Sequence, residues 1–211
     1  MREEKKQKKK EVSISKTFTV PFSVSEIKDR ININGKNNLS KLSKKQIANG
    51  ALKYHREGNT SSAIKYYKYF ISQGYLDPIV FSNYGILLKS INEIEEAKKF
   101  FYKAIEVKND FAEAYYNLGT LLKEEGRIEE ARKLILKTIE LNYELAIAHS
   151  FLGAILEELG KLRDAEKSVR VAIEISPKLT IAHLNLGNIL RKLDKLHEAE
   201  NCYRKAIELN P

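Results

Sequence analysis

The sequence predicts an all-α fold, an α-α solenoid of five helix-turn-helix repeats preceded by a disordered basic N-terminal tail. Three segments, at residues 117–142, 151–176 and 185–210, align without gaps and follow one another at a constant spacing. A fixed period of about 20–50 residues is typical of repeat architectures, in which stacked neighbours bury a continuous core. The composition fits, because hydrophobic residues make up 43% of the 211 residues, whereas only 4 Pro and 10 Gly are present, fewer than a loop-rich β protein needs.

Extending this period backwards divides most of the chain into five units. The units are residues 44–77, 78–111, 112–145, 146–179 and 180–211, which make one predicted domain, 44–211, after a tail and linker at 1–43. Positions 8 and 20 of the units carry small residues, which let two antiparallel helices approach closely. These residues are Ala51, Gly85, Gly119, Gly153 and Gly187 at position 8, and Ala63, Ala97, Ala131, Ala165 and Ala199 at position 20.

Position 15 predicts the turn between the two helices of each unit. It is occupied only by Gly, Asn and Asp, the residues that best tolerate the left-handed conformation that ends a helix. They are Gly58, Asn92, Gly126, Gly160 and Asp194. Each unit is therefore expected to contain a helix A, a tight turn and a helix B.

Capping signals predict where the first helices of three units begin. Ser43 with Gln46, and Asp110 with Glu113, have the spacing of a capping box. Asp77 precedes a proline, which is a good N-cap followed by a first-turn proline.

This pattern, a helix-turn-helix unit of about 34 residues, resembles the tetratricopeptide repeat (TPR) family over about four fifths of the chain. The resemblance implies a right-handed TPR superhelix in which helix A of each unit lines a concave groove. The chain departs from the family at position 4, where an aromatic residue is usual. Here position 4 reads Ile47, Phe81, Tyr115, His149 and His183.

Position 6 of helix A gives the candidate binding site. It reads Asn49, Asn83, Asn117, Phe151 and Asn185, so four of the five units carry an asparagine. This row is similar to the asparagine ladder in the TPR groove of the protein O-GlcNAc transferases, which implies that it binds the backbone of an extended peptide. An asparagine has both donors and an acceptor for such bonds. The alternative is that asparagine is simply common at this position. Further groove candidates are Tyr116, Thr120, Ser150, Ala154 and Asn188.

No motif for catalysis, metal binding or a cofactor accompanies the repeats. His149 and His183 hold the same position in adjacent units, but no Cys, Asp or Glu has the spacing to complete a metal site. Cys202 is the only cysteine, has no acid–base set beside it and is interpreted as a structural thiol. The sequence therefore predicts a non-catalytic scaffold that holds a protein or peptide partner, with no cofactor and no metal. The alternative is the substrate-recruiting arm of a glycosyltransferase-type or other enzyme whose catalytic part lies elsewhere.

The two ends of the chain raise separate hypotheses. Residues 1–43 hold 11 Lys/Arg and 5 Asp/Glu, so most of the +9 formal charge lies in the tail, and contact with nucleic acid or an anionic membrane is a possible but not favoured role. Residues 11–24 alternate apolar and polar residues like a strand. The last repeat lacks the usual covering helix, so we expect either self-association through this repeat or a chain that is part of something longer. The single cysteine and the lack of an apolar run predict a cytoplasmic protein.

Overall fold

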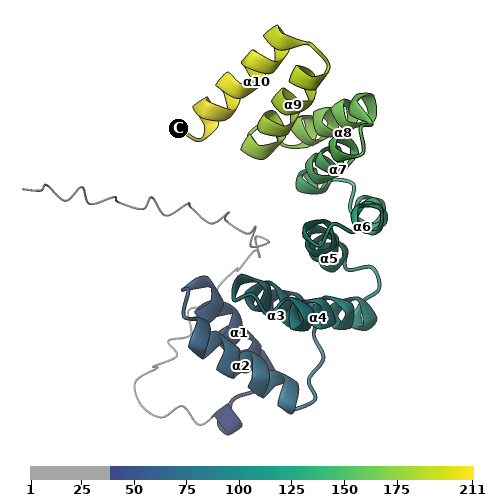
Figure 1. The fold of residues 1–211 in the computed structure, drawn as a ribbon. Coiled ribbons are helices and arrows are strands. Elements are labelled where there is room, and N and C mark those ends of the chain that lie inside the picture. The colour runs from purple at the N-terminus through teal and green to yellow at the C-terminus, as the bar shows by residue number, and fades with distance from the viewer. Residues whose placement is uncertain (1–38) are drawn as a thin grey trace, which may run out of the picture. The chain divides into compact units, whose positions relative to one another are not determined.

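The odd-numbered helices recur at one constant spacing along the chain, and the even-numbered helices recur at the same spacing. The structure, a computed structural model, describes residues 39–211, which belong to one compact unit, Asn38–Pro211. The described part contains a short 3-10 helix, Leu39–Lys41, and ten α-helices and no strand. The helices are α1 (Lys44–Arg56), α2 (Thr60–Ser72), α3 (Pro78–Ser90), α4 (Ile94–Val107), α5 (Ala112–Glu124), α6 (Ile128–Leu141), α7 (Ala146–Glu158), α8 (Leu162–Ile175), α9 (Thr180–Lys192) and α10 (Leu196–Leu209). The expected all-α solenoid of five hairpins is confirmed (Figure 1). The expectations for the basic tail and for residues 11–24 fall outside the described residues.

The turn within each hairpin has the predicted left-handed residue. The backbone φ angles are 70° at Gly58, 65° at Asn92, 76° at Gly126, 72° at Gly160 and 61° at Asp194. A residue with a larger branched side chain would be strained at any of these five positions. Position 15 was therefore a reliable sign of where helix A ends.

Two of the three expected helix caps form, and the third does not. Ser43 makes a full capping box with Gln46, and the Asp77 carboxylate accepts hydrogen bonds from two backbone N–H groups at the start of α3. Asp110 was expected to cap α5, but that helix begins at Ala112 and its N-cap is Phe111, which has no side-chain cap bond. Phe111 packs against the core instead, so an apolar contact replaces a polar cap at this helix start.

Small residues let the two helices of each hairpin approach closely. A Cβ atom on Gly85 would lie 2.6 Å from a ring carbon of Phe101, and one on Gly187 would lie 2.6 Å from a ring carbon of Tyr203. In the first hairpin the close approach also uses Gly50, one residue before the aligned Ala51, because the Tyr66 ring fills the space beside it. Replacing these glycines would push an aromatic ring out of the core.

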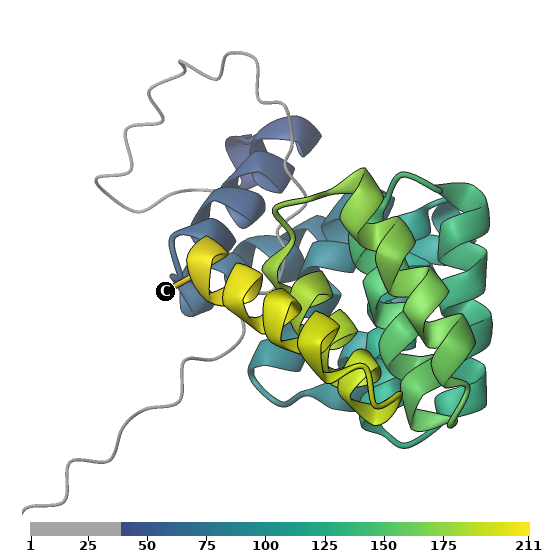
Figure 2. The same cartoon turned by 90° about the horizontal axis from the view of Figure 1, so that it is seen from above.

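Neighbouring hairpins stack so that one core runs through all five. Each even-numbered helix contacts the odd-numbered helix that follows it, as α4 contacts α5 and α8 contacts α9. The odd-numbered helices also contact one another, α1 with α3, α3 with α5, and α7 with α9. Figures 1 and 2 show this succession of hairpins within the described unit. The odd-numbered helices therefore form the row on which the candidate binding residues lie.

Position 4 ties helix A of three repeats to the turn before it. The Tyr115 hydroxyl donates to the carbonyl oxygen of Asn109 at 3.0 Å. The Nε2 atoms of His149 and His183 lie 2.9 Å and 2.8 Å from carbonyl oxygens at the same offset of six residues. Both histidines are buried. The histidines that replace the usual aromatic residue thus make the hydrogen bond that Tyr115 makes.

Candidate functional site

The five position-6 side chains lie one to a helix along the row of odd-numbered helices. Each occupies the same turn of its helix, because the odd-numbered helices begin at equivalent positions of successive repeats. They are Asn49 on α1, Asn83 on α3, Asn117 on α5, Phe151 on α7 and Asn185 on α9, and all five are half-buried. A partner could therefore reach only part of each side chain. The contacts that each side chain makes within the protein decide which of its atoms a partner can use.

Two of the asparagines are held by a serine of the preceding repeat. The Nδ2 group of Asn117 donates to Ser82 Oγ at 3.0 Å, and that of Asn185 donates to Ser150 Oγ at 3.0 Å. The two serines are buried, with 3% and 1% of their surface exposed. Each bond joins position 5 of one repeat to position 6 of the next. The carboxamides are therefore oriented by their donors, and among the hydrogen bonds of residues 39–211 their Oδ1 atoms accept none.

Asn83 and Asn49 lack this serine contact. The residue at position 5 before Asn83 is Ala48, which has no hydroxyl, and Asn83 Nδ2 donates to the carbonyl of Ile79 in its own helix at 2.9 Å. No described repeat precedes Asn49, and no described residue hydrogen-bonds to its carboxamide. Asn49 and Asn83 are thus not held by a preceding repeat, whereas Asn117 and Asn185 are.

Phe151 also contacts position 5 of the preceding repeat, but through an aromatic ring instead of a hydrogen bond. Its ring packs edge-on against Tyr116, with centroids 5.8 Å apart and planes at 70°. Tyr116 holds position 5 of the preceding repeat, where Ser82 and Ser150 stand in the other contacts. Burial raises the pKa of Tyr116 to about 12, so its hydroxyl stays protonated. The residue that interrupts the asparagine row is therefore matched to an aromatic neighbour, and comparing positions 5 and 6 of successive repeats would have revealed this from sequence.

Three stretches of the chain match family models described as tetratricopeptide repeat, at residues 80–111, 100–133 and 180–211. These stretches of the chain are tetratricopeptide repeats. No curated protein matches the sequence.

Solved TPR structures have the same fold at low sequence identity. MamA 41-end from Desulfovibrio magneticus RS-1 is 21% identical, with 79% of this chain and 94% of that chain covered and a TM-score of 0.67. PilF of Pseudomonas aeruginosa is 18% identical, with 80% and 77% covered and a TM-score of 0.72. YrrB is 21% identical, with 80% and 87% covered and a TM-score of 0.62.

The flanking candidates in the TPR array differ in how available they are. Thr120 Oγ1 donates to the carbonyl of Asn117, and Asn188 Oδ1 accepts from the Tyr203 hydroxyl at 2.9 Å. Ser150 is buried and already bonded to Asn185, whereas Ala154 is half-buried. Of these four residues only Ser150 holds a side chain of the row, and the Oδ1 atoms of Asn83, Asn117 and Asn185 accept no hydrogen bond from the described residues.

A row of ion pairs runs beside the asparagines, nearer the end of helix A. It joins position 12 of one repeat to position 13 of the next, by Lys89–Glu124 and Lys123–Glu158 at 2.7 Å each. In the last contact the signs are reversed, and Lys192 reaches back to Glu157 at 2.9 Å. Because each pair is neutral, this row does not favour a strongly charged partner.

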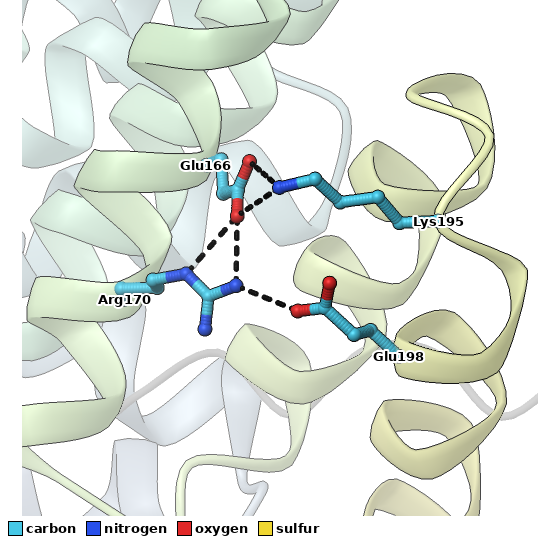
Figure 3. A network of polar contacts seen from close by, with 4 residues as sticks. All are labelled: Glu166, Arg170, Lys195 and Glu198. Carbon is cyan, nitrogen blue, oxygen red and sulfur yellow. Dashed lines mark hydrogen bonds and ion pairs between the residues drawn. The ribbon is translucent and has the colours of Figure 1, made fainter.

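A second ionic network lies between α8 and the last hairpin (Figure 3). The Glu166 carboxylate accepts from Arg170 at 2.7 Å and from Lys195 at 3.0 Å, and Arg170 also donates to Glu198 at 3.0 Å. Burial by itself raises the pKa of Glu166, but the hydrogen bonds from Arg170 and Lys195 outweigh it and leave that pKa lowered. The network therefore links repeats 4 and 5 through charge.

The remaining candidate groups fit structural roles. Cys202 is half-buried, and burial raises the pKa of its thiol, which disfavours the reactive thiolate. Residues 39–211 contain no group of three or more His, Cys, Asp or Glu side chains able to hold a metal ion. None of the ten described helices is long and apolar enough to cross a bilayer.

Proposed function

We propose that the TPR array of residues 44–211 is a non-catalytic scaffold that binds an extended segment of a partner protein along its odd-numbered helices. The observation that carries this proposal is the row of asparagine Oδ1 atoms. Asn83, Asn117 and Asn185 each use Nδ2 within the protein and leave Oδ1 without a hydrogen bond from the described residues. A backbone N–H of a partner can donate to each of these oxygens without regard to its side chains. The fold shared with YrrB, described as a TPR protein with an unusual peptide-binding site, supports this class of partner.

The repeat spacing favours one conformation of the partner. Packed neighbouring helices lie about 8–10 Å apart. A polyproline II segment advances about 3.1 Å per residue with three residues per turn, so one turn spans about one repeat and presents an N–H in the same direction at each step. A β-strand alternates direction at every residue, so a three-residue step would turn every second N–H away. We therefore expect a partner segment close to polyproline II.

The aromatic step offers the partner an apolar contact. Phe151 and Tyr116 stand where an asparagine–serine pair would continue the row, and both rings are half-buried. An apolar partner side chain next to them would be removed from water, at a gain of about 25 cal/mol per Å² of apolar surface. The array would then read one apolar residue between two stretches of backbone contacts.

The test asks whether the asparagine Oδ1 atoms bind the partner or whether the asparagines only hold neighbouring repeats together. Peptides selected from a random library on the immobilised full chain would be measured against a variant with Asn83→Ala, Asn117→Ala and Asn185→Ala. Each net hydrogen bond contributes about 0.5–1.5 kcal/mol, so affinity should fall about 10- to 100-fold or more while the helical circular dichroism stays unchanged. Methylation of every third backbone nitrogen of the peptide should have a similar effect.

The matched control is Ser82→Ala with Ser150→Ala. It removes the two hydrogen bonds to serine hydroxyls that the asparagine variant also removes, leaves the 3.3 Å bond from Asn185 Nδ2 to the Ser150 carbonyl, and keeps every Oδ1 atom. It should bind within a few-fold of the parent protein. Equal losses in the two variants, or full binding by the asparagine variant, would show that the asparagines only support the stack.

A further inference from the structure

Repeat 5 carries a second asparagine on the same face of its helix A as the asparagine of the row. Asn185 and Asn188 lie three residues apart on α9, both half-buried. This spacing makes two side chains neighbours on a helix, with Cβ atoms about 5–6 Å apart. Position 9 has no amide side chain in the other four repeats, where it reads Leu52, Ile86, Thr120 and Ala154. Repeat 5 thus presents two adjacent carboxamides where each other repeat presents at most one.

Internal hydrogen bonds orient these two carboxamides in opposite senses. Asn185 Nδ2 donates to Ser150 Oγ at 3.0 Å and to the Ser150 carbonyl at 3.3 Å, which leaves its Oδ1 unused. Asn188 Oδ1 instead accepts from the Tyr203 hydroxyl at 2.9 Å, which leaves its Nδ2 unused. The pair therefore offers one hydrogen-bond acceptor and one donor, side by side.

Both unused atoms are open to solvent. Within residues 39–211 every buried side-chain nitrogen or oxygen atom has a hydrogen-bond partner. Asn185 Oδ1 and Asn188 Nδ2 have no partner among the described residues, so neither atom is buried. Position 9 is half-buried in all five repeats, so the exposure of Asn188 is a property of this position and not of its place in the array. Both atoms are therefore available to a ligand.

The chemical group that complements this pair is a primary carboxamide. Its oxygen accepts from Asn188 Nδ2, and its NH2 group donates to Asn185 Oδ1. One trans peptide group cannot do the same, because its N–H and C=O point in opposite directions. A carboxylate has no hydrogen to donate to Oδ1, and an ammonium group cannot accept from Nδ2.

We propose that repeat 5 binds the side-chain carboxamide of a glutamine or asparagine in the partner segment. This inference rests on the proposed binding of an extended segment along the odd-numbered helices. The Asn185 oxygen has two lone pairs, so it can accept from the partner backbone and from the carboxamide together. Phe151 lies one repeat away, so a polyproline II segment would carry the carboxamide about three residues from its apolar side chain.

The charges near this pair make a glutamate the competing ligand. Lys192, one turn beyond Asn188, is paired with Glu157 at 2.9 Å and adds no unbalanced charge. Arg191 is exposed and lies three residues beyond Asn188, so it would attract a carboxylate. A glutamate would, however, bring its negative charge against Asn185 Oδ1. The test therefore compares glutamine directly with glutamate.

The experiment is selection of peptides from a random library on the immobilised full chain and on its Asn188→Asp variant. Aspartate keeps the acceptor for Tyr203 but replaces the donor with a second acceptor. Peptides selected on the parent should share a glutamine or asparagine about three residues from an apolar residue. The variant should select peptides that keep the apolar residue but lose this preference. Asn201→Asp, at an exposed position of α10, is the matched control and should select the same peptides as the parent.

Affinities of one selected peptide complete a double-mutant cycle. Replacing its glutamine with methionine or glutamate should weaken binding to the parent about tenfold, because hydrogen bonds to the pair are lost. On Asn188→Asp the replacement with methionine should change binding by less than about threefold. Equal losses on both proteins, a preference for glutamate, or parent-selected peptides without a shared glutamine or asparagine would each overturn the proposal. The scaffold function is judged separately, by whether the parent selects any binding peptide; if it selects none, this inference fails with it.

Discussion

The first and the last contacts between repeats join equivalent helices but are held by different chemistry. Where repeat 1 meets repeat 2, the Tyr84 ring stacks on Tyr67 at 4.9 Å and packs against Phe100 at 4.7 Å. Where repeat 4 meets repeat 5, the contacts include the Ser150–Asn185 hydrogen bond and the Glu166 network of Figure 3. One helical hairpin can thus be stacked by aromatic burial or by polar pairing without changing the fold.

This difference matters because each repeat contacts only its neighbours. The stability of such an array is approximately a sum of terms from single repeats and single contacts. A substitution in one contact should therefore be felt locally, and the two ends should respond differently to truncation, salt and acid. Hydrogen exchange of the full chain, resolved by segment, can separate these responses.

The largest effect is expected from Tyr84→Ala. Tyr84 is 3% exposed and touches aromatic rings on both sides of the first contact, so its removal leaves a cavity. Truncating a buried aromatic residue typically costs about 3–5 kcal/mol. Urea unfolding should show this loss, and amide exchange should speed up mainly in α1 to α4. Tyr102→Ala is the control, because Tyr102 is 46% exposed and should change stability by less than about 1 kcal/mol. A uniform rise in exchange over all ten helices would contradict local stacking.

Much of this fold could be predicted because each signal was local and repeated. Position 15 needed a left-handed residue in every repeat, and all five residues adopt it, from Gly58 to Asp194. The Ser43 and Asp77 caps depend on residues two or three positions away, so their spacing was sufficient. Asp110 had the same spacing, but the packing of Phe111 decided where α5 starts. That contact is tertiary, and no local pattern could reveal it.

The candidate site was harder to predict because its contacts cross between repeats. The asparagine row was visible in the sequence, but its Nδ2 donors depend on a serine of the preceding repeat. Gly50 is a similar case, because the Tyr66 ring makes position 7 the closely approached residue in the first hairpin. Comparing position 5 of each repeat with position 6 of the next, instead of each position alone, would have shown that Phe151 has a partner in Tyr116.

A smaller effect is expected from Glu166→Gln in the last contact. The substitution keeps the shape of the side chain but removes the charge that Arg170 and Lys195 share. We expect a loss of about 1 kcal/mol at low salt, which should shrink at high salt because partly exposed pairs are screened. Urea unfolding at two salt concentrations measures both the loss of stability and its dependence on salt. Glu96→Gln, in a surface pair with Lys99 within α4, serves as the control and should have little effect. A loss that does not depend on salt would mean that Glu166 acts through packing.

The smallest effect, and the one that best separates the two contacts, is their response to acid. Burial lowers the pKa of His55 from its ordinary 6.5, and its Nδ1 lies 3.1 Å from the Tyr67 hydroxyl in the first hairpin. Because the folded protein binds this proton less readily than the unfolded chain does, its contribution is complete well above pH 6.5 and declines as pH falls from there through the lowered pKa. The contribution of Glu166 has the same sign but begins to decline only near the ordinary carboxylate value of 4.5.

Mild acid should therefore loosen the N-terminal end of the array before the C-terminal end. Amide exchange, corrected for the intrinsic effect of pH, should rise in α1 and α2 between pH 7 and 5 while α8 to α10 stay protected. His55→Gln should remove the pH dependence of the first step, since glutamine does not titrate in this range. Two outcomes would contradict this prediction: α8 to α10 opening first, or His55→Gln keeping the pH profile of the parent protein. In either case protonation of His55 would not make the first contact more sensitive to acid than the last.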